Sequence, residues 1–382
     1  MKIILSGVET RNKGAELMLY AILQEIERKY PNATVYVEPD SIPQGVGYIK
    51  TTLKLKDKPV AYARRLARRL RLFSVLKLLK ISWLPLEDIY AMRDADYYLN
   101  DSGYSITDKW NITEYELRIR ELTYSKQSKQ RTKMVFLPQA FGPIEKENTK
   151  LNVCLLNKFA DLVMARDRIS YNYLKESGLI DMKKVQIHPD FTSLVKGSFP
   201  VSHDGLKGGV CIIPNVRMLD MDTLSYNQYK AFIHEIVLIA KDNGKKAYLL
   251  NHEGEEDRNL AKRFQRDIND DLYVVDGLDA LEIKGLIATA YLVISSRFHG
   301  VVSSLNSCVP CLATSWSHKY EELYRDYHQD GCVLDPRDID TVTQKVRQYI
   351  NPKKNASVRE HLSLILPKMQ RQAEQMWEHV WS

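Results

Sequence analysis

The sequence predicts an α/β protein of two domains. Short apolar runs alternate with longer helical patterns along the chain, and this alternation is typical of parallel sheets covered by helices. The alternation stops at a loop-like stretch near residues 195–208 and then begins again. A chain of 382 residues is also too long for one ordinary hydrophobic core. We therefore expect two Rossmann-like domains, over residues 1–197 and 205–357, that face each other across a cleft.

The first predicted domain opens with a strand, a turn that contains Gly7 and Gly14, and a helix over Glu16–Lys29. Its predicted strands are short, apolar and followed by turn or cap residues: Ile3–Leu5, Val35–Val37, Tyr97–Leu99, Met134–Leu137, Leu162–Met164 and Val185–Ile187. Pro138 is one of these ending signals, because proline cannot donate a hydrogen bond to a neighbouring strand.

The second predicted domain repeats the pattern. Its predicted strands are Val210–Ile213, Ala247–Leu250, Tyr273–Val275, Leu292–Ile294, Cys311–Thr314 and Val333–Leu334, and its helices are Tyr226–Asp242, Ala280–Ala290 and Val301–Ser307. A last helix is predicted over residues 358–382, and the sequence leaves open whether it packs back on the first domain. In open α/β sheets, ligands bind beyond the carboxyl ends of the strands, so polar residues that follow strands are the candidates for function.

Composition narrows the classes of protein. A hydrophobic content of 44% with 27% charged residues excludes overall disorder. The chain has no run of about 18 apolar residues and no signal-peptide pattern, so we expect a cytoplasmic protein. Cys308 and Cys311 form a CxxC, but no second ligand pair accompanies them. They are expected to be two small buried residues rather than a zinc or redox site.

A formal net charge of +7 favours an anionic partner. The excess is concentrated between Lys50 and Lys80, where eleven cations accompany one acid, Asp57. Residues 63–80 have the spacing of a basic amphipathic helix. One interpretation is peripheral contact with the anionic inner face of the cell membrane, and the slightly favoured one is a helix packed on the first domain. Nucleic acid is not expected, because aromatic residues are scarce there and no nucleic-acid motif appears.

The most informative segment follows the predicted strand Leu292–Ile294. The polar turn Ser295–Gly300 carries Arg297 and His299 to the end of that strand and the start of a helix. A helix N-terminus favours anions, and arginine offers a planar fork to a carboxylate or phosphate. Histidine is the side chain best suited to move a proton near neutral pH. For an Arg-x-His alone, an ion pair for Arg297 and a helix cap for His299 would be the favoured explanation, but the second loop at the same sheet edge, with His318 and Lys319, favours a functional one.

An ordered set of segments resembles the polysaccharide pyruvyl transferase family. The C-terminal part of the set is Ser-Arg-Phe-His-Gly at 296–300, followed by Val-Pro, a strand and Ser-His-Lys-Tyr at 317–320. The other matching segments are Arg11–Glu16, Pro138–Pro143, Ala165–Leu174 and His188–Asp190. The resemblance extends from about residue 3 to residue 335 and implies an architecture like the B-type glycosyltransferases. The first domain would then be the acceptor side and the second the donor side.

The family transfers pyruvate from phosphoenolpyruvate to sugar hydroxyls, usually two on one residue, and so forms a cyclic ketal. The resemblance implies phosphoenolpyruvate as donor and, as acceptor, a saccharide of a surface polysaccharide or exopolysaccharide or its lipid-linked precursor. It implies no cofactor and no obligatory metal. Because the donor carries a carboxylate and a phosphate, it requires several cations. We expect His299 to act as the general acid or base while Arg297 and Lys319 hold the donor.

Three further donor-side candidates follow from the same resemblance. Arg217 follows the first strand of the second domain and matches a family arginine that faces the donor. His318 precedes Lys319 in the second loop at the same sheet edge. His252 follows another strand, where the family often has histidine, and a solvated acidic loop is an equally good interpretation of that segment.

The acceptor-side candidates are Asn12, Glu16 and Asp101. Asn12 and Glu16 lie at the N-terminus of the first predicted helix, where capping and complementing the helix dipole explain them at least as well. Asp101 stands where the family has a glycine-rich turn, of which this sequence keeps only Gly103.

Two other functions remain open. A glycosyltransferase that uses a nucleotide sugar suits two Rossmann-like domains equally well, and the cation-rich turn would then hold a diphosphate. A catalytically silent protein that binds a glycan or a membrane is the third alternative. The combination of Arg297, His299 and Lys319 argues against it.

Overall fold

The computed structural model describes residues 1–37, 52–55, 95–109, 132–220, 224–269, 271–314 and 319–382. Two compact units are distinguished. Unit 1 comprises Met1–Thr10, Met18–Phe191 and Gln375–Ser382, and unit 2 comprises Arg11–Leu17 and Thr192–Glu374. The chain therefore crosses from unit 1 to unit 2 between residues 191 and 192. The boundary expected from the sequence lies between residues 197 and 205. The basic stretch 63–80 lies outside the described residues.

Unit 1 contains a parallel seven-stranded sheet in the order β3-β2-β1-β4-β5-β6-β7. Its strands are β1 (Lys2–Ser6), β2 (Thr34–Val37), β3 (Thr52–Leu55), β4 (Tyr97–Asn100), β5 (Lys133–Gln139), β6 (Leu162–Ala165) and β7 (Val185–Ile187). The order reverses between β1 and β4, as in a Rossmann sheet. The structure thus confirms the predicted strands of the first half and adds β3.

The structure corrects the role of Pro138. This residue was predicted to end a strand, but β5 continues through it to Gln139. The pairing of β5 with β6 changes register between Phe136 and Gln139, which marks an irregularity in the ladder. Proline is tolerated within a sheet at such a place, because no ladder hydrogen bond is required from its nitrogen.

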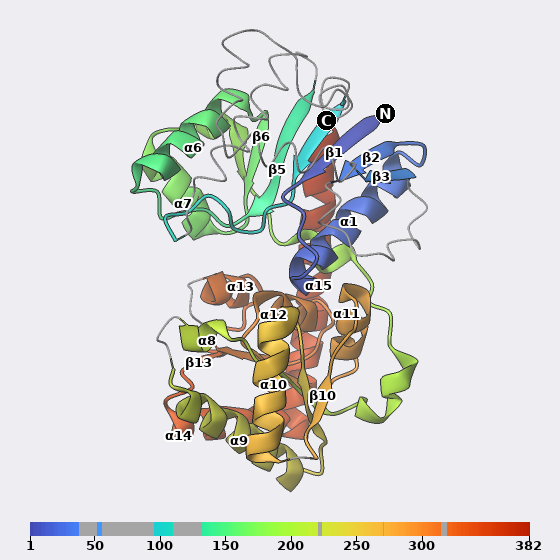
Figure 1. Cartoon of the computed structure of the whole chain (residues 1–382), viewed down its shortest axis with the longest axis vertical. Coiled ribbons are helices and arrows are strands. Elements are labelled where there is room, and N and C mark those ends of the chain that lie inside the picture. The colour runs from blue at the N-terminus through green and yellow to red at the C-terminus, as the bar shows by residue number, and fades with distance from the viewer. Residues whose placement is uncertain (38–51, 56–94, 110–131, 221–223, 270, 315–318) are drawn as a thin grey trace. The chain divides into compact units, whose positions relative to one another are not determined.

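The described helices of unit 1 include most of α1 (Lys13–Lys29), α6 (Glu147–Phe159) and α7 (Arg168–Ser177). Helix α7 contacts β6 and β7, and Figure 1 shows it near the labelled β6. Helix α7 begins where Asp167 accepts a hydrogen bond from the Ser170 amide at 2.6 Å, and it ends at Gly178, whose φ of 63° is left-handed.

The end of the chain belongs to unit 1. The ring of Trp381 lies edge-on, with its centroid 5.0 Å from that of Tyr97, and its indole nitrogen donates to Glu25 at 2.9 Å. Lys133 donates from Nζ to the carbonyls of His379 and Val380, in the last turn of α15, at 3.1 and 3.0 Å. A lysine at this place satisfies helix carbonyls that have no partner in the helix.

Unit 2 contains a second parallel sheet, of six strands in the order β10-β9-β8-β11-β12-β13. Its strands are β8 (Val210–Ile213), β9 (Ala247–Leu250), β10 (Tyr273–Val275), β11 (Leu292–Ser295), β12 (Cys311–Thr314) and β13 (Val333–Leu334). The order reverses between β8 and β11, so this unit repeats the Rossmann topology. The predicted strands of the second half are confirmed.

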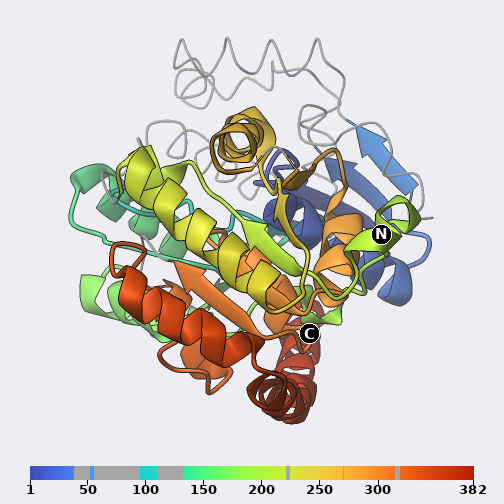
Figure 2. The ribbon, with the colours of Figure 1, turned by 90° about the horizontal axis from the view of Figure 1, so that it is seen from below.

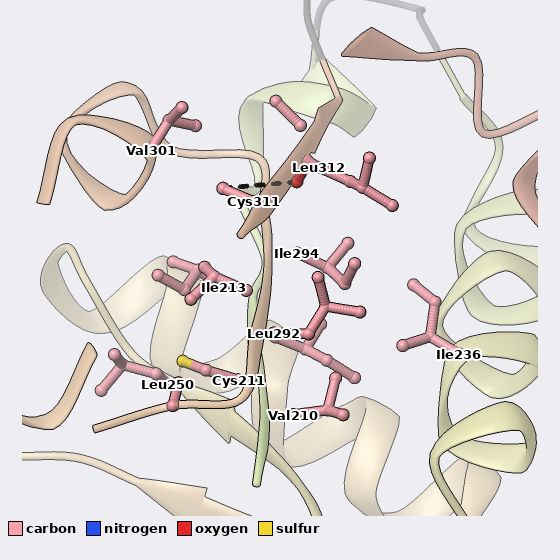
Figure 3. Close-up of a cluster of buried hydrophobic side chains, with 14 of the residues drawn as sticks. Val210, Cys211, Ile213, Ile236, Leu250, Leu292, Ile294, Val301, Cys311 and Leu312 are labelled. Carbon is pink, nitrogen blue, oxygen red and sulfur yellow. Dashed lines mark hydrogen bonds between the residues drawn. The ribbon is translucent and has the colours of Figure 1, made fainter. Parts of the chain in front are cut away.

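The helices described in unit 2 are α8 (Arg217–Asp220), α9 (Tyr226–Asp242), α10 (Gly254–Ile268), α11 (Ala280–Ala288), α12 (Phe298–Leu305), α13 (Lys319–Asp326), α14 (Ile339–Ile350) and most of α15 (Pro352–Trp381). Figure 2 shows α9 and α14 side by side. In the core, side chains of β8, β11 and β12 pack together, and Ile236 of α9 points toward them (Figure 3). Cys311 is buried in β12, and burial raises the pKa of its thiol to about 12, which agrees with a structural role.

Three helices begin earlier in the chain than predicted. Helix α1 begins at Lys13, because the Oδ1 atom of Asn12 accepts hydrogen bonds from the first-turn amides. Helix α12 begins at Phe298, and α15 begins at Pro352, a residue favoured at the first helical position. Among the described residues, no helix combines the length and apolarity needed to cross a bilayer.

Candidate active site

The candidate site of unit 2 lies where its strand order reverses, at the carboxyl ends of the neighbouring strands β8 and β11. Asn215 and Arg217 follow β8, and Arg297 and His299 follow β11. Strand β9, on the other side of β8, is followed by His252. Crevices at such a reversal are the usual ligand sites of open α/β sheets.

A buried hydrogen-bond network fixes the turn between β11 and α12. The Oγ atom of Ser296 lies 2.7 Å from both the Tyr229 hydroxyl and Oγ1 of Thr314. The carbonyl of Ser296 accepts hydrogen bonds from Nδ2 of Asn215 and from the Tyr320 hydroxyl, both at 2.9 Å. Satisfied buried networks of this kind make a backbone rigid, so the residues that follow are held in place.

Gly300 explains the end of the Ser-Arg-Phe-His-Gly segment. A Cβ atom at this position would lie 2.5 Å from Oγ of Ser295 and 2.8 Å from Cδ1 of Ile213. The absence of a side chain therefore allows α12 to approach the sheet closely and brings its N-terminus to the strand ends. Arg297 is the N-cap residue of this helix, and its amide donates to Oγ of Ser295 at 3.1 Å.

Arg297 is held by two carboxylates. Its Nε atom donates to Oδ2 of Asp257 at 2.7 Å and its Nη2 atom lies 2.6 Å from the same oxygen, while Nη1 pairs with Oε2 of Glu253. Burial lowers the pKa of Arg297 to about 10, so the guanidinium remains charged at neutral pH. The pKa of Asp257 is raised to about 7, mainly by burial, although the hydrogen bond from the Val216 amide and the charge of Arg217 act in the opposite direction.

Sequence reasoning did not identify these two acids as partners of Arg297. Both lie in the acidic run from Glu253 to Asp257, whose composition is typical of a solvent-exposed loop. The sequence did offer one indication of a role at the site. The run lies between a strand, β9, and a helix, α10, just as Arg297 lies between β11 and α12.

His299, in the first turn of α12, packs against Gly14. A Cβ atom built on Gly14 would lie 2.0 Å from Nδ1 of His299, so the imidazole occupies the space that any other residue would fill. Gly14 is held there because its amide donates to Oδ1 of Asn12 at 2.9 Å, at the start of α1. The segment Arg11–Leu17 thus contributes to unit 2 although the rest of α1 belongs to unit 1.

His252 lies in the same surroundings and is neutral. The pKa of His252 is lowered to about 3, mainly by burial and in addition by the nearby charges of Arg297, His299 and Lys13. The side chain is almost wholly buried, and among the described residues its Nδ1 atom has no hydrogen-bond partner. Its carbonyl accepts a hydrogen bond from the Lys13 amide at 3.4 Å.

Two further predicted cations lie at this sheet edge. Lys319 is the first residue of α13, and its Nζ atom is 5.2 Å from the ring centroid of Phe298, which itself lies edge-on to the His299 ring. Arg217 opens α8, is about half exposed, and pairs with Asp220 at 3.2 Å. His318 lies outside the described residues.

The acceptor-side candidates fall in different units. Asn12 and Glu16 group with unit 2, where Glu16 is buried and accepts a hydrogen bond from Nζ of Lys13 at 2.6 Å. Asp101 follows β4 in unit 1. Burial, followed by repulsion from Asp190, raises the pKa of Asp101 well above its usual range.

Comparison with known proteins adds a family and a fold. The model of the family described as polysaccharide pyruvyl transferase matches residues 12–318. No curated protein sequence matches this chain.

Among solved structures, Anabaena HepE in complex with UDP-glucose aligns with a TM-score of 0.62 at 14% identity, covering 100% of this chain and 99% of that one. Staphylococcus aureus MnaA in complex with UDP aligns with a TM-score of 0.63 at 13% identity, covering 100% and 96%. A putative UDP-N-acetylglucosamine 2-epimerase from Listeria monocytogenes gives 0.62 at 11%, covering 99% and 94%. These likenesses concern the fold, which is that of the B-type glycosyltransferases with two Rossmann-like domains. Since the family model covers most of the chain, this protein belongs to the polysaccharide pyruvyl transferase family.

Proposed function

We propose that this protein transfers pyruvate from phosphoenolpyruvate to hydroxyls of a saccharide and forms a ketal. The observation that carries the proposal is the arrangement at the β8–β11 reversal. There, Arg297 and His299 stand at the N-terminus of α12, and Lys319 lies beside Phe298. Membership of the family supports the same assignment.

The proposed chemistry assigns each group a task. Lys319, Arg217 and Arg297 attract the carboxylate and phosphate of the donor. His299 transfers a proton in the step in which C3 of phosphoenolpyruvate is protonated and a sugar hydroxyl attacks C2. A second hydroxyl then attacks C2 and phosphate leaves. Of the two hydroxyl protons, one is balanced by the proton gained at C3 and the other leaves with phosphate, so no redox cofactor is needed.

The acceptor is a saccharide, and we propose that it belongs to a surface polysaccharide or exopolysaccharide, in free or lipid-linked form. We place the reaction in the cytoplasm, where phosphoenolpyruvate is made, with the enzyme in solution or peripherally on the inner face of the membrane.

A nucleotide-sugar transferase is the second candidate, because solved structures of the same fold contain UDP or UDP-glucose. One experiment separates the two. Thermal unfolding is measured alone, with phosphoenolpyruvate, and with uridine or guanosine diphosphate. A ligand present at about 100 times its Kd adds roughly 2.7 kcal/mol of stability.

Stabilisation by phosphoenolpyruvate, weakened in Lys319→Ala and kept in the exposed control Lys262→Ala, is expected. Release of phosphate that depends on an added saccharide would complete the assignment. Stabilisation by a nucleotide alone would favour glycosyl transfer instead, and no response to any of the three would contradict both enzymatic functions.

A further inference from the structure

The proposed donor-binding role of Arg297 raises a question of charge. The guanidinium group has two edges that each hold a carboxylate, and in this structure both edges have a carboxylate partner. The positive charge of Arg297 is therefore already neutralised by carboxylates before an anionic donor binds. The two carboxylates are not equivalent, and their difference identifies the one that a donor replaces.

Asp257 is a fixed partner. Its side chain is fully buried, its Oδ1 atom accepts a hydrogen bond from the Val216 amide at 2.9 Å, and its Oδ2 atom takes the Nε and Nη2 atoms of Arg297. Removing a buried carboxylate from such a pair leaves an uncompensated buried charge, which costs several kilocalories per mole. Asp257 therefore orients Arg297 and remains in place when a ligand binds.

Glu253 is an exchangeable partner. Its side chain is 31% exposed, compared with 0% for Asp257, so it occupies the solvent side of Arg297. It is the N-cap residue of α10, yet its side chain makes no capping hydrogen bond to that helix. Loss of its contact with Arg297 would therefore leave the start of α10 unchanged.

The Oε2 atom of Glu253 also accepts a hydrogen bond from Nδ2 of Asn12 at 3.2 Å. Nη1 of Arg297 and Nδ2 of Asn12 thus both donate hydrogen bonds to the same oxygen atom. A carboxylate or phosphate oxygen of a ligand would find the same two donors there. The Oδ1 atom of Asn12 accepts a hydrogen bond from the Gly14 amide of α1, which fixes the side chain. Its Nδ2 atom therefore remains in place to donate to a ligand oxygen after Glu253 has left.

We propose that Glu253 occupies the anion position of Arg297 in the free protein and that an anionic substrate binds by displacing it. Glu253 thereby determines specificity. Weak anions do not compete with the intramolecular carboxylate, whereas a ligand with two anionic groups also gains the contacts of nearby cations such as Lys319. The identity of that ligand as phosphoenolpyruvate rests on the proposed function, but the displacement itself does not.

The test is the sign of the affinity change in Glu253→Gln. Glutamine is the same size and accepts hydrogen bonds but carries no charge, so an incoming anion displaces it more easily. We expect the full-length variant to bind phosphoenolpyruvate about 5- to 30-fold more tightly than the unaltered protein, measured by titration calorimetry, because one nearby negative charge has been removed. Glu255→Gln makes the same charge change at an exposed position of α10 and is expected to alter the affinity less than about twofold.

Two results would overturn the proposal. If Glu253→Gln weakens anion binding, Glu253 is a positioning residue for Arg297 rather than a competitor of the ligand. If Glu255→Gln strengthens binding equally, the effect is a general one of charge.

Parallel titrations with inorganic phosphate and with UDP separate this proposal from the proposed function. If Glu253→Gln tightens binding of either anion while phosphoenolpyruvate binds to neither protein, displacement is confirmed and pyruvyl transfer fails. If no anion binds to the variant, the displacement proposal is wrong.

Discussion

The two sheets have the same strand order around their reversal points, yet different side chains follow the strands there. In unit 2 the residues beyond β8 and β11 include Arg217, Arg297 and the imidazole of His299, and Arg297 is compensated by Asp257 and Glu253. In unit 1 the corresponding edge carries the buried carboxyl group of Asp101 and, nearby, Asp190, whose Oδ2 atom lies 3.8 Å from Nη1 of the buried Arg166. Among the described residues, neither carboxylate oxygen of Asp101 has a hydrogen-bond partner.

The comparison separates what the fold provides from what the residues provide. The topology supplies a polar edge in each unit, because parallel strands end together and their connections begin there. The side chains, and how deeply they are buried, determine which charges are stable at that edge. The buried His252 of unit 2 resists protonation and the buried Asp101 of unit 1 resists ionisation, so the two edges should respond to pH in opposite directions.

The largest expected effect concerns the imidazole of unit 2. His299→Ala should lower kcat by about 10²–10⁴-fold, the range that positioned proton transfer contributes, while the Kd for phosphoenolpyruvate changes by only a few-fold. Single-turnover rates and calorimetric titration give the two quantities. His234→Ala, at an exposed position on α9, is the matched control. Near-normal turnover of His299→Ala would refute the catalytic role of His299.

The second effect tests the contact between α1 and α12. In Gly14→Ala the new methyl group would lie 2.0 Å from Nδ1 of His299, so the ring or the helix must move. We expect kcat to fall by about 10–100-fold, because small displacements of a catalytic group are costly, and stability to fall by about 1–3 kcal/mol from overpacking.

Gly205→Ala is the control for this prediction, since its Cβ atom would meet only Nζ of Lys246, at 3.9 Å. Turnover and chemical denaturation are measured for both variants. If Gly14→Ala has unchanged turnover, the close contact does not position the imidazole of His299.

The third effect is the acid sensitivity of unit 2. A histidine has a pKa of about 6.5 in the unfolded chain, while that of His252 in the folded protein is lowered to about 3. The unfolded state therefore binds a proton that the folded state does not, and stability falls as the pH drops from about 6.5 toward 3. At pH 5 the loss due to His252 should be about 2 kcal/mol.

His252→Gln should lack this loss, whereas the exposed control His234→Gln should keep it. Hydrogen exchange of the β9 and β11 amides at pH 7 and pH 5 reports on this unit alone. An equal pH dependence in the unaltered protein and His252→Gln would show that His252 is charged in the folded state.

The strands of both sheets and several residues that follow them could be predicted from the sequence, because short sequence patterns determine them. Strands such as Val210–Ile213 and Cys311–Thr314 are short, apolar and bounded by turn residues, so their limits agree with prediction. Arg297 and His299 could be found because they directly follow such a strand.

Other features could not be predicted because they depend on contacts between distant residues. The pairing of Arg297 with Glu253 and Asp257 spans about 40 positions and depends on β8 separating β9 from β11 in the sheet. The need for glycine at position 14 arises from a ring 285 positions later in the chain. Local patterns place each of these residues at a strand end or a helix start but carry no signal for which of them are in contact.

The last expected effect lies in unit 1 and has the opposite sign. The unfolded pKa of an aspartate is about 3.9, and that of Asp101 in the folded protein is raised well above it. Between these two values the folded state keeps a proton that the unfolded state loses, so Asp101 lowers stability progressively as the pH rises from about 4. Asp101→Asn cannot ionise and should therefore be more stable than the unaltered protein at pH 7.5, with a higher melting temperature.

That advantage should disappear below about pH 4, where the carboxyl group is protonated in both states. Hydrogen exchange of the β4 and β5 amides measures unit 1 separately, and Glu176→Gln, an exposed change on α7, is the control. A variant that is less stable by the same amount at every pH would mean that the carboxyl group of Asp101 serves as a hydrogen-bonding partner in both protonation states. The contrast between the two edges would then reduce to the cations of unit 2. If the advantage grows with pH as expected, the edge of unit 1 holds a carboxylic acid that is protonated at neutral pH, a group able to donate a hydrogen bond to a ligand oxygen where the edge of unit 2 offers cations.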